Sequence, residues 1–161
     1  PSQYAKLAAG KQYAVYSAPS DASFRAANGK ALLSTNDWVQ VFFEEDGYLL
    51  VQYAISRHQY RIGYIKADAV SNLSEVAEIG SWANYPAQVL RTSALTDDPL
   101  NSCGAVMTLK AGQQVTYLGQ LGQEWAFVET TTAQGQRIRG FVELSELNVT
   151  RPDDADDNLN G

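Results

Sequence analysis

The residues in this chain that could perform nucleophilic chemistry are its single cysteine, Cys103, and its single histidine, His58. A thiolate needs an adjacent base and an oxyanion site on a rigid element. Both residues fall in predicted loops of different parts of the chain, so we interpret them as a loop histidine and a half-buried thiol. One cysteine and one histidine also exclude an ordinary zinc site. We therefore expect a protein that is not an enzyme, with no catalytic residues, no metal and no cofactor.

Two acidic segments are the other candidates for chemistry. Residues 44–46, Glu-Glu-Asp, form the tip of a predicted hairpin and could supply half of an acid–base pair or bind an ammonium group. Nothing places a second carboxylate opposite them, as glycoside hydrolysis requires, so we interpret them as a solvated turn. Residues 156–161 match the first six positions of a calcium loop, without the glutamate of its twelfth position. An acidic terminus is the default interpretation, and the start of a calcium-binding segment is the alternative.

Aromatic residues are the best material for binding. In a strand over residues 125–129, Trp125 and Phe127 share one face, and Ala126 and Val128 share the other. If the valine faces the core, the aromatic side chains point toward the rim, where they add apolar area and a polar handle to a binding groove. The alternative role of each is packing. The candidate ligand-binding residues are Tyr16, Tyr48, Trp125 and Phe127.

The elements that position these residues occur twice. Residues 38–51 align without a gap on residues 115–128, and the same offset of 77 pairs residues 62–65 with 139–142. A period this long indicates two copies of one small domain. The alignment places Trp38 at the core position of Val115.

Short apolar–polar alternations, interrupted by Gly, Asn, Asp and Pro, predict an all-β protein of small barrels. We expect one barrel over residues 1–73, a second over 74–150, and an acidic, flexible tail over 151–161. A predicted strand at 76–81 opens the second copy and leaves residues 71–74 as a short linker. The copies then sit at a fixed mutual angle, with Trp82 and Tyr85 joining them. The cleft between them is a second candidate site.

The repeated motifs resemble the bacterial SH3 (SH3b) domain. Copy two carries a Leu-x-x-Gly turn ending at Gly112, then Trp-Ala-Phe-Val at 125–128 and Gly-Phe-Val at 140–142. Copy one matches with Gly-Tyr-Leu-Leu-Val at 47–51 and Gly-Tyr-Ile at 63–65. The resemblance implies two SH3-like barrels in rigid tandem, of a kind that accompanies cell-wall hydrolases. Such domains bind peptidoglycan peptides or serve as spacers and interaction modules outside the cytoplasm.

The charge distribution argues against several classes of partner. The net charge is −6, and residues 1–150 carry 11 basic and 14 acidic side chains. A nearly neutral body with an acidic tail lacks the basic surface that binds nucleic acid or anionic membranes. The sequence contains no apolar run of 18 residues, so it predicts no membrane-spanning helix.

Together these observations predict a non-catalytic, extracytoplasmic binding or spacer module of a bacterial protein, with a cell-wall peptide or a protein as its partner. In the first case the rim aromatics recognise peptidoglycan peptides. In the alternative, the chain is a structural or interaction module that docks a partner in the cleft between its copies. The sequence leaves the ligand and the oligomeric state open.

Overall fold

The computed structural model describes residues 7–8, 10–26, 29–71, 73–100 and 105–152. Over these residues the chain is all-β, as the sequence predicts, with twelve strands in four antiparallel sheets. The short alternating segments account for this fold, because they bury one face of a strand and sustain no helical stripe. The strands are β1 (Gln12–Ala14), β2 (Leu32–Ser34), β3 (Val39–Glu45), β4 (Tyr48–Ser56), β5 (Gln59–Lys66), β6 (Tyr85–Val89), β7 (Ser93–Leu95), β8 (Met107–Leu109), β9 (Gln114–Leu121), β10 (Trp125–Thr131), β11 (Arg137–Glu143) and β12 (Leu147–Val149).

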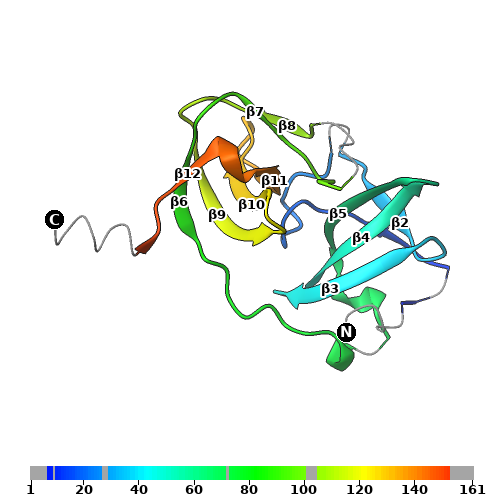
Figure 1. The fold of residues 1–161 in the computed structure, drawn as a ribbon. Coiled ribbons are helices and arrows are strands. Elements are labelled where there is room, and N and C mark those ends of the chain that lie inside the picture. Colours follow the sequence, from blue (N-terminus) through cyan, green and yellow to red (C-terminus); the bar gives the residue numbers. More distant parts are fainter. Residues whose placement is uncertain (1–6, 9, 27–28, 72, 101–104, 153–161) are drawn as a thin grey trace.

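The strands form two groups, which lie side by side in Figure 1. Strands β1–β5, here the N-half, form the sheets β1-β2 and β3-β4-β5; strands β6–β12, the C-half, form β11-β10-β9-β6-β12 and β7-β8. Each half has its own buried core, which includes Val51 and Ile65 in the N-half and Val128 and Val142 in the C-half. Within the described ranges, no sheet contains strands of both halves, although Phe24, which lies between β1 and β2, packs against the core of the C-half.

The halves share one register. Val51 pairs with Gly63 between β4 and β5, and Val128 pairs with Gly140 between β10 and β11. A 3-10 turn follows each hairpin, η2 (Ala67–Ala69) after β5 and η4 (Leu144–Glu146) after β11. All these positions are 77 residues apart, as the repeat predicts, whereas the turn η3 (Leu73–Glu75) belongs to the connection between the halves.

The gap-free alignment is wrong by one residue on the preceding strand. Residues 46–47 join β3 to β4, whereas three residues, 122–124, join β9 to β10. A shift of one residue moves every side chain of a strand to the opposite face. Trp38 therefore does not take the core position of Val115: it is 50% exposed and packs edge-on against Tyr60.

The predicted strand at 76–81 is also wrong. Val76 is buried in the core of the N-half, and Glu78 makes a single bridge to Glu44 at the edge of β3. The Glu44 N–H donates to the Ala77 carbonyl, and its carbonyl accepts from the Ile79 N–H, each at 2.8 Å. The connection between the halves is therefore longer than residues 71–74, and it runs along the N-half before β6 begins (Figure 1).

A third apolar cluster, here the boundary cluster, lies between the halves. Its buried members come from equivalent strands: Leu50 and Phe127 are 77 residues apart, as are Tyr64 and Phe141, and Leu118 of β9 completes the set. The partly buried members are Tyr16, Phe42, Phe43, Tyr48, Ile62, Trp82 and Trp125. The outer faces of β3-β4-β5 and β9-β10-β11 therefore pack against each other.

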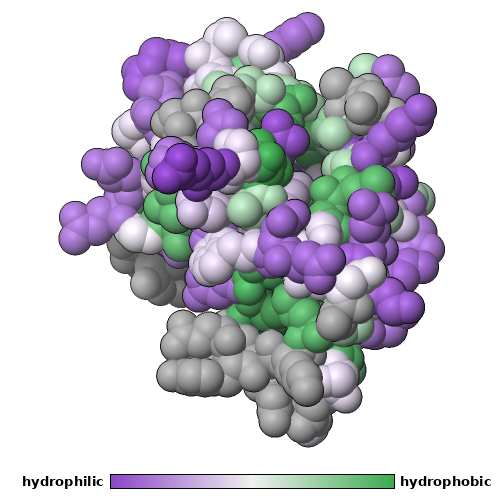
Figure 2. Space-filling model, turned by 90° about the vertical axis from the view of Figure 1, so that its right-hand side faces the viewer, coloured by the Kyte–Doolittle hydropathy of each residue, from purple (hydrophilic) through white to green (hydrophobic). Residues whose placement is uncertain are grey.

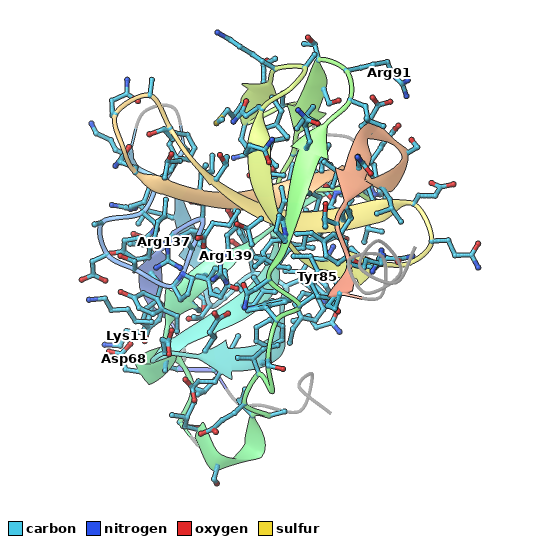
Figure 3. The ribbon with its side chains drawn as sticks, turned by 90° about the vertical axis from the view of Figure 1, so that its left-hand side faces the viewer. Lys11, Asp68, Tyr85, Arg91, Arg137 and Arg139 are labelled. Carbon is cyan, nitrogen blue, oxygen red and sulfur yellow. The ribbon has the colours of Figure 1, made fainter. Side chains whose placement is uncertain are left out.

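An ion pair is buried at the centre of this boundary. Arg139 Nη1 of the C-half lies 3.0 Å from Glu45 Oε1 of the N-half, and their side chains are 6% and 8% exposed. The same nitrogen donates to the Tyr64 hydroxyl at 2.8 Å, while Arg139 Nε donates to Glu129 at 2.8 Å. Glu45 Oε1 also accepts hydrogen bonds from the Tyr64 hydroxyl (2.9 Å) and the Trp82 indole N–H (3.0 Å). Figure 3 shows Arg139 where the two groups of strands meet.

The protonation states of this network follow from its packing. Burial opposes the charge of Arg139, but the neighbouring Tyr64, Glu129 and Glu45 outweigh it, so the pKa of Arg139 is raised. Burial is also the main cause that raises the pKa of Tyr64. Burial alone would raise the pKa of Glu129, yet hydrogen bonds from Arg139 and Arg137 lower it. The arginine is therefore held charged and the tyrosine neutral.

We predict that Arg139→Met destabilises the protein by about 3–5 kcal/mol, because the substitution leaves the buried carboxylate of Glu45 without its cation. Chemical denaturation measures this change. Arg91→Met is the matched control, since Arg91 also pairs with a glutamate, Glu146, but its side chain is 66% exposed. Equal midpoints for the two variants would contradict the role of the buried pair.

We also predict that Gly63→Ala and Gly140→Ala each destabilise the fold by about 1–3 kcal/mol through overpacking. A Cβ on Gly63 would lie 2.5 Å from Val15 Cγ1, and one on Gly140 would lie 2.9 Å from the Thr96 carbonyl oxygen. Gly80→Ala is the control, because a Cβ there has no heavy atom within 4 Å. Thermal unfolding of the three variants checks the prediction, and unchanged midpoints for both repeat glycines would refute it.

Candidate functional site

The four predicted ligand-binding aromatics all reach the boundary cluster. Phe127 is only 6% exposed, packs against Trp82 and Phe141 and is buried in the boundary cluster, so it offers no surface to a ligand. Tyr16 and Tyr48 are half-buried and meet edge-on, with ring centroids 5.8 Å apart. Trp125 is half-buried and also lines a groove on the outside of the C-half.

The two residues predicted to join the halves lie in different places. Trp82 is in the boundary cluster, with its ring 5.5 Å from that of Phe43 in the N-half and 5.4 Å from that of Phe127 in the C-half. Tyr85 lies in β6 and stacks on Tyr117 of the same half at 6.0 Å, with Arg151 over its ring. Tyr85 therefore packs within the C-half (Figure 3).

The groove at Trp125 has a volume of about 320 Å³. It opens where β7 separates from β11, and its floor includes the buried Val142 and Thr96. The other lining residues are Thr92, Ser93, Ala94, Ala105, Trp125, Glu143 and Glu146. An indole wall, a buried apolar floor and a few polar groups are the usual composition of a small binding site.

The backbone along the groove is arranged to accept a strand. Thr96 and Phe141 exchange both of their backbone hydrogen bonds, at 2.9 and 2.8 Å. In an antiparallel pair of strands, the backbone N–H and C=O groups of every second residue point toward the partner strand. The next pair would be Ala94 and Glu143, yet no backbone hydrogen bond joins these two described residues. By this alternation, the N–H and C=O of Ala94 and the N–H of Glu143 lie on the sides of their strands that face the groove, while the Glu143 C=O caps η4.

The charge of the groove is negative. Glu143 is exposed, and within the described part of the chain its carboxylate makes no ion pair or hydrogen bond. Glu146 is held by Arg91 in a bidentate pair at 3.0 and 3.1 Å. A neighbouring hollow of about 520 Å³, lined by Glu124, meets the groove at Glu143. Of the residues that the structure describes, no lysine or arginine lines either depression.

The equivalent place in the N-half is already occupied. Tyr48 and Lys66 pair across β4 and β5, as Trp125 and Glu143 pair across β10 and β11. The carboxylate of Asp21 accepts a hydrogen bond from the Tyr48 hydroxyl and lies 3.1 Å from the Lys66 ammonium. The same pair of positions thus holds a carboxylate of the chain itself in the N-half, and presents an open groove in the C-half.

Sequence reasoning missed Asp21, Glu143 and the buried pair of Arg139 and Glu45. A signal was present for two of them. The 77-residue offset places Glu143 on Lys66, a reversal of charge, and Arg139 on Ile62, a charge at an apolar position of a strand. Nothing in the repeat marks Asp21, because it lies in a loop.

The other sequence candidates form no site within the described residues. His58 is in the tight turn between β4 and β5, and Cys103 and the calcium-loop pattern at 156–161 lie outside the described residues. The interpretation of residues 44–46 as a solvated turn is wrong for Glu45, which ends β3 and is buried against Arg139. Asp46 is exposed in the turn, and the Glu44 carboxylate accepts the Gly47 N–H at 2.9 Å. Among the described residues, no three His, Cys, Asp or Glu side chains gather as metal ligands would, and no helix has the length and apolarity to cross a membrane.

The outer surface seen in Figure 2 is mixed, with hydrophobic residues appearing between hydrophilic ones in several places. Large exposed apolar side chains come from both halves and include Leu32, Leu90 and Leu121. Single exposed apolar residues are normal on a protein surface and indicate no site by themselves.

We predict that Tyr48 titrates with a pKa of about 12, raised first by burial and then by the hydrogen bond and charge of Asp21. Asp21→Asn removes the negative charge that opposes the phenolate, so the pKa should fall, while burial keeps it above the ordinary value of about 10. NMR of ring-labelled tyrosine against pH measures this shift, with Tyr48→Phe for assignment. Asp37→Asn, an exposed carboxylate of the same half, should leave the value unchanged. A wild-type value near 10 would contradict the contact.

Comparison of the chain with protein family models, with curated proteins and with solved structures finds no match.

Proposed function

We propose that this chain is a non-catalytic binding module of an extracytoplasmic bacterial protein, built as two SH3-like barrels in rigid tandem. Its ligand is an extended peptide, such as a stem or cross-bridge peptide of peptidoglycan, held in the groove at Trp125. The observation that carries the proposal is the combination of an indole wall with backbone groups of Ala94 and Glu143 facing one groove. Backbone hydrogen bonds supply affinity in strand addition, and side-chain pockets supply selectivity.

In this proposal the two halves have different roles. The C-half binds, because its groove is open. The N-half acts as a spacer and support, because Asp21 occupies the equivalent positions and the outer face of β3-β4-β5 is used by the boundary cluster. The buried ion pair fixes the angle between the halves and therefore the direction in which the groove faces.

The alternative function, docking of a partner between the halves, has less support. Aromatic and aliphatic side chains of the boundary cluster fill that space. The cavity that both halves line beside Arg139 measures only about 40 Å³, too little for a segment of a partner chain.

The proposal is tested with purified bacterial cell walls, with and without removal of teichoic acid. We predict that the chain is retained in both cases and that Trp125→Ala reduces retention about tenfold or more, since buried tryptophans commonly dominate binding energy. Trp38→Ala is the matched control, because this tryptophan is more exposed than Trp125 and lies far from the groove in the N-half. Circular dichroism confirms that each variant is folded.

The outcomes separate the alternatives. Equal loss of retention in both tryptophan variants, or none in either, would refute the groove as the binding site. Loss of all binding on removal of teichoic acid would show that the ligand is the anionic polymer and not a peptide. Absence of any retention by the wild-type chain would leave docking of a protein partner as the better function.

A further inference from the structure

We infer that the groove of the C-half selects a peptide carrying a primary ammonium group, as in a lysine-type side chain, which binds Glu143 and lies against Trp125. This inference rests on the proposed function and names the class of peptide that the site accepts. It follows from the direct pairing of Trp125 with Glu143 and from the charge of the surrounding side chains.

Trp125 and Glu143 form a direct cross-strand pair between β10 and β11. Trp125 lies two residues before Phe127, and Glu143 lies two residues after Phe141, the partner of Phe127. The side chains of Trp125 and Glu143 therefore lie on the same face of the hairpin. Directly opposite residues have Cβ atoms about 4.5–5.5 Å apart. A cation that binds the carboxylate therefore lies within reach of the indole ring, and a cation over a tryptophan face gains electrostatic attraction.

The carboxylates that line the groove and the adjoining hollow favour a ligand of positive charge. Glu143 has no cationic partner within the described part of the chain, whereas Glu146 is engaged by Arg91. Glu124 adds a third carboxylate in the adjoining hollow. A ligand with a carboxylate at this point would meet repulsion, whereas an ammonium group would meet an unpaired carboxylate and an aromatic face.

In the N-half, the position equivalent to Glu143 carries the opposite charge, that of Lys66. Tyr48 and Lys66 stand where the C-half has Trp125 and Glu143, and they hold the carboxylate of Asp21. This internal copy shows that an aromatic residue paired with a charged residue at these positions contacts a group of opposite charge. With Glu143 in place of Lys66, the group of opposite charge is a cation, and none of the described residues supplies it.

The test uses synthetic peptides and the whole chain. The probe is an acetylated and amidated alanine pentapeptide with one central lysine, compared with the same peptide bearing Nε-acetyl-lysine and with one bearing glutamate. NMR titration of the ¹⁵N-labelled protein follows the amides of Ala94 and Glu143 and the Trp125 indole. The lysine peptide is expected to bind at least about tenfold more tightly than the acetylated one, and the glutamate peptide is expected to produce no shift.

Variants of the chain separate charge from fold. Glu143→Gln should remove the preference for lysine, and Glu143→Lys, which copies Lys66, should favour the glutamate peptide. Glu78→Gln, an exposed glutamate on the segment between the halves, should leave the preference unchanged. Equal affinity of the lysine and acetyl-lysine peptides, or a preference that survives Glu143→Gln, would overturn the inference.

The two proposals fail separately. Cell-wall retention that depends on Trp125 but not on Glu143 would support the proposed function and overturn the cation site. Binding of the lysine peptide without retention on cell walls would support the cation site and overturn the peptidoglycan ligand. Absence of both would overturn both.

Discussion

The buried pair of Arg139 and Glu45 is the interaction on which the arrangement of the two halves depends. Apolar packing is non-directional, so the boundary cluster alone would tolerate a range of angles between the halves. A buried ion pair tolerates no such range, because the cost of desolvating both charges is offset only when the geometry is good and the remaining polar atoms are bonded. Glu129, Tyr64 and Trp82 meet that condition around Arg139 and Glu45. The boundary is thus specified by hydrogen bonds and stabilised by apolar contact.

The fixed boundary also decides which surfaces remain for binding. It covers the outer faces of β3-β4-β5 and β9-β10-β11, including Phe127. The aromatic faces of the two halves therefore pack against each other and are not available to a ligand. Trp125 is at the edge of that layer, and it is the predicted aromatic that both packs in the boundary cluster and lines the open groove. The groove itself exists because β7 leaves β11 after a single bridge at Thr96. Position in the fold, more than residue type, makes this tryptophan the candidate.

Features that depend on residue alternation and on the internal repeat were predictable from the sequence. The all-β class follows from alternation, and the equivalence of residues 62–65 with 139–142, which the paired strands β5 and β11 share, follows from the 77-residue offset. It failed where one residue of loop length decides a face, as at Trp38, and where an extended segment packs on its neighbour without joining its sheet, as at Val76. The burial of Phe127 was not predictable either, because an outward-facing aromatic has the same local pattern whether solvent or another domain covers it.

An open strand edge is a hazard as well as a binding surface, since unpaired N–H and C=O groups also pair with a second copy of the chain. The C-half leaves such an edge at Ala94 and Glu143. A charged side chain on an edge is a common means of preventing this self-association, and two grooves brought together would oppose their Glu143 carboxylates. In the proposed function, the same charge attracts a cationic peptide. In the N-half, the loop that carries Asp21 reaches the corresponding positions, and the Asp21 carboxylate pairs with Lys66. The charge of Lys66 is therefore used within the chain and contributes neither to self-association nor to binding. In that proposal, a single glutamate both opposes pairing with a second copy and selects the ligand.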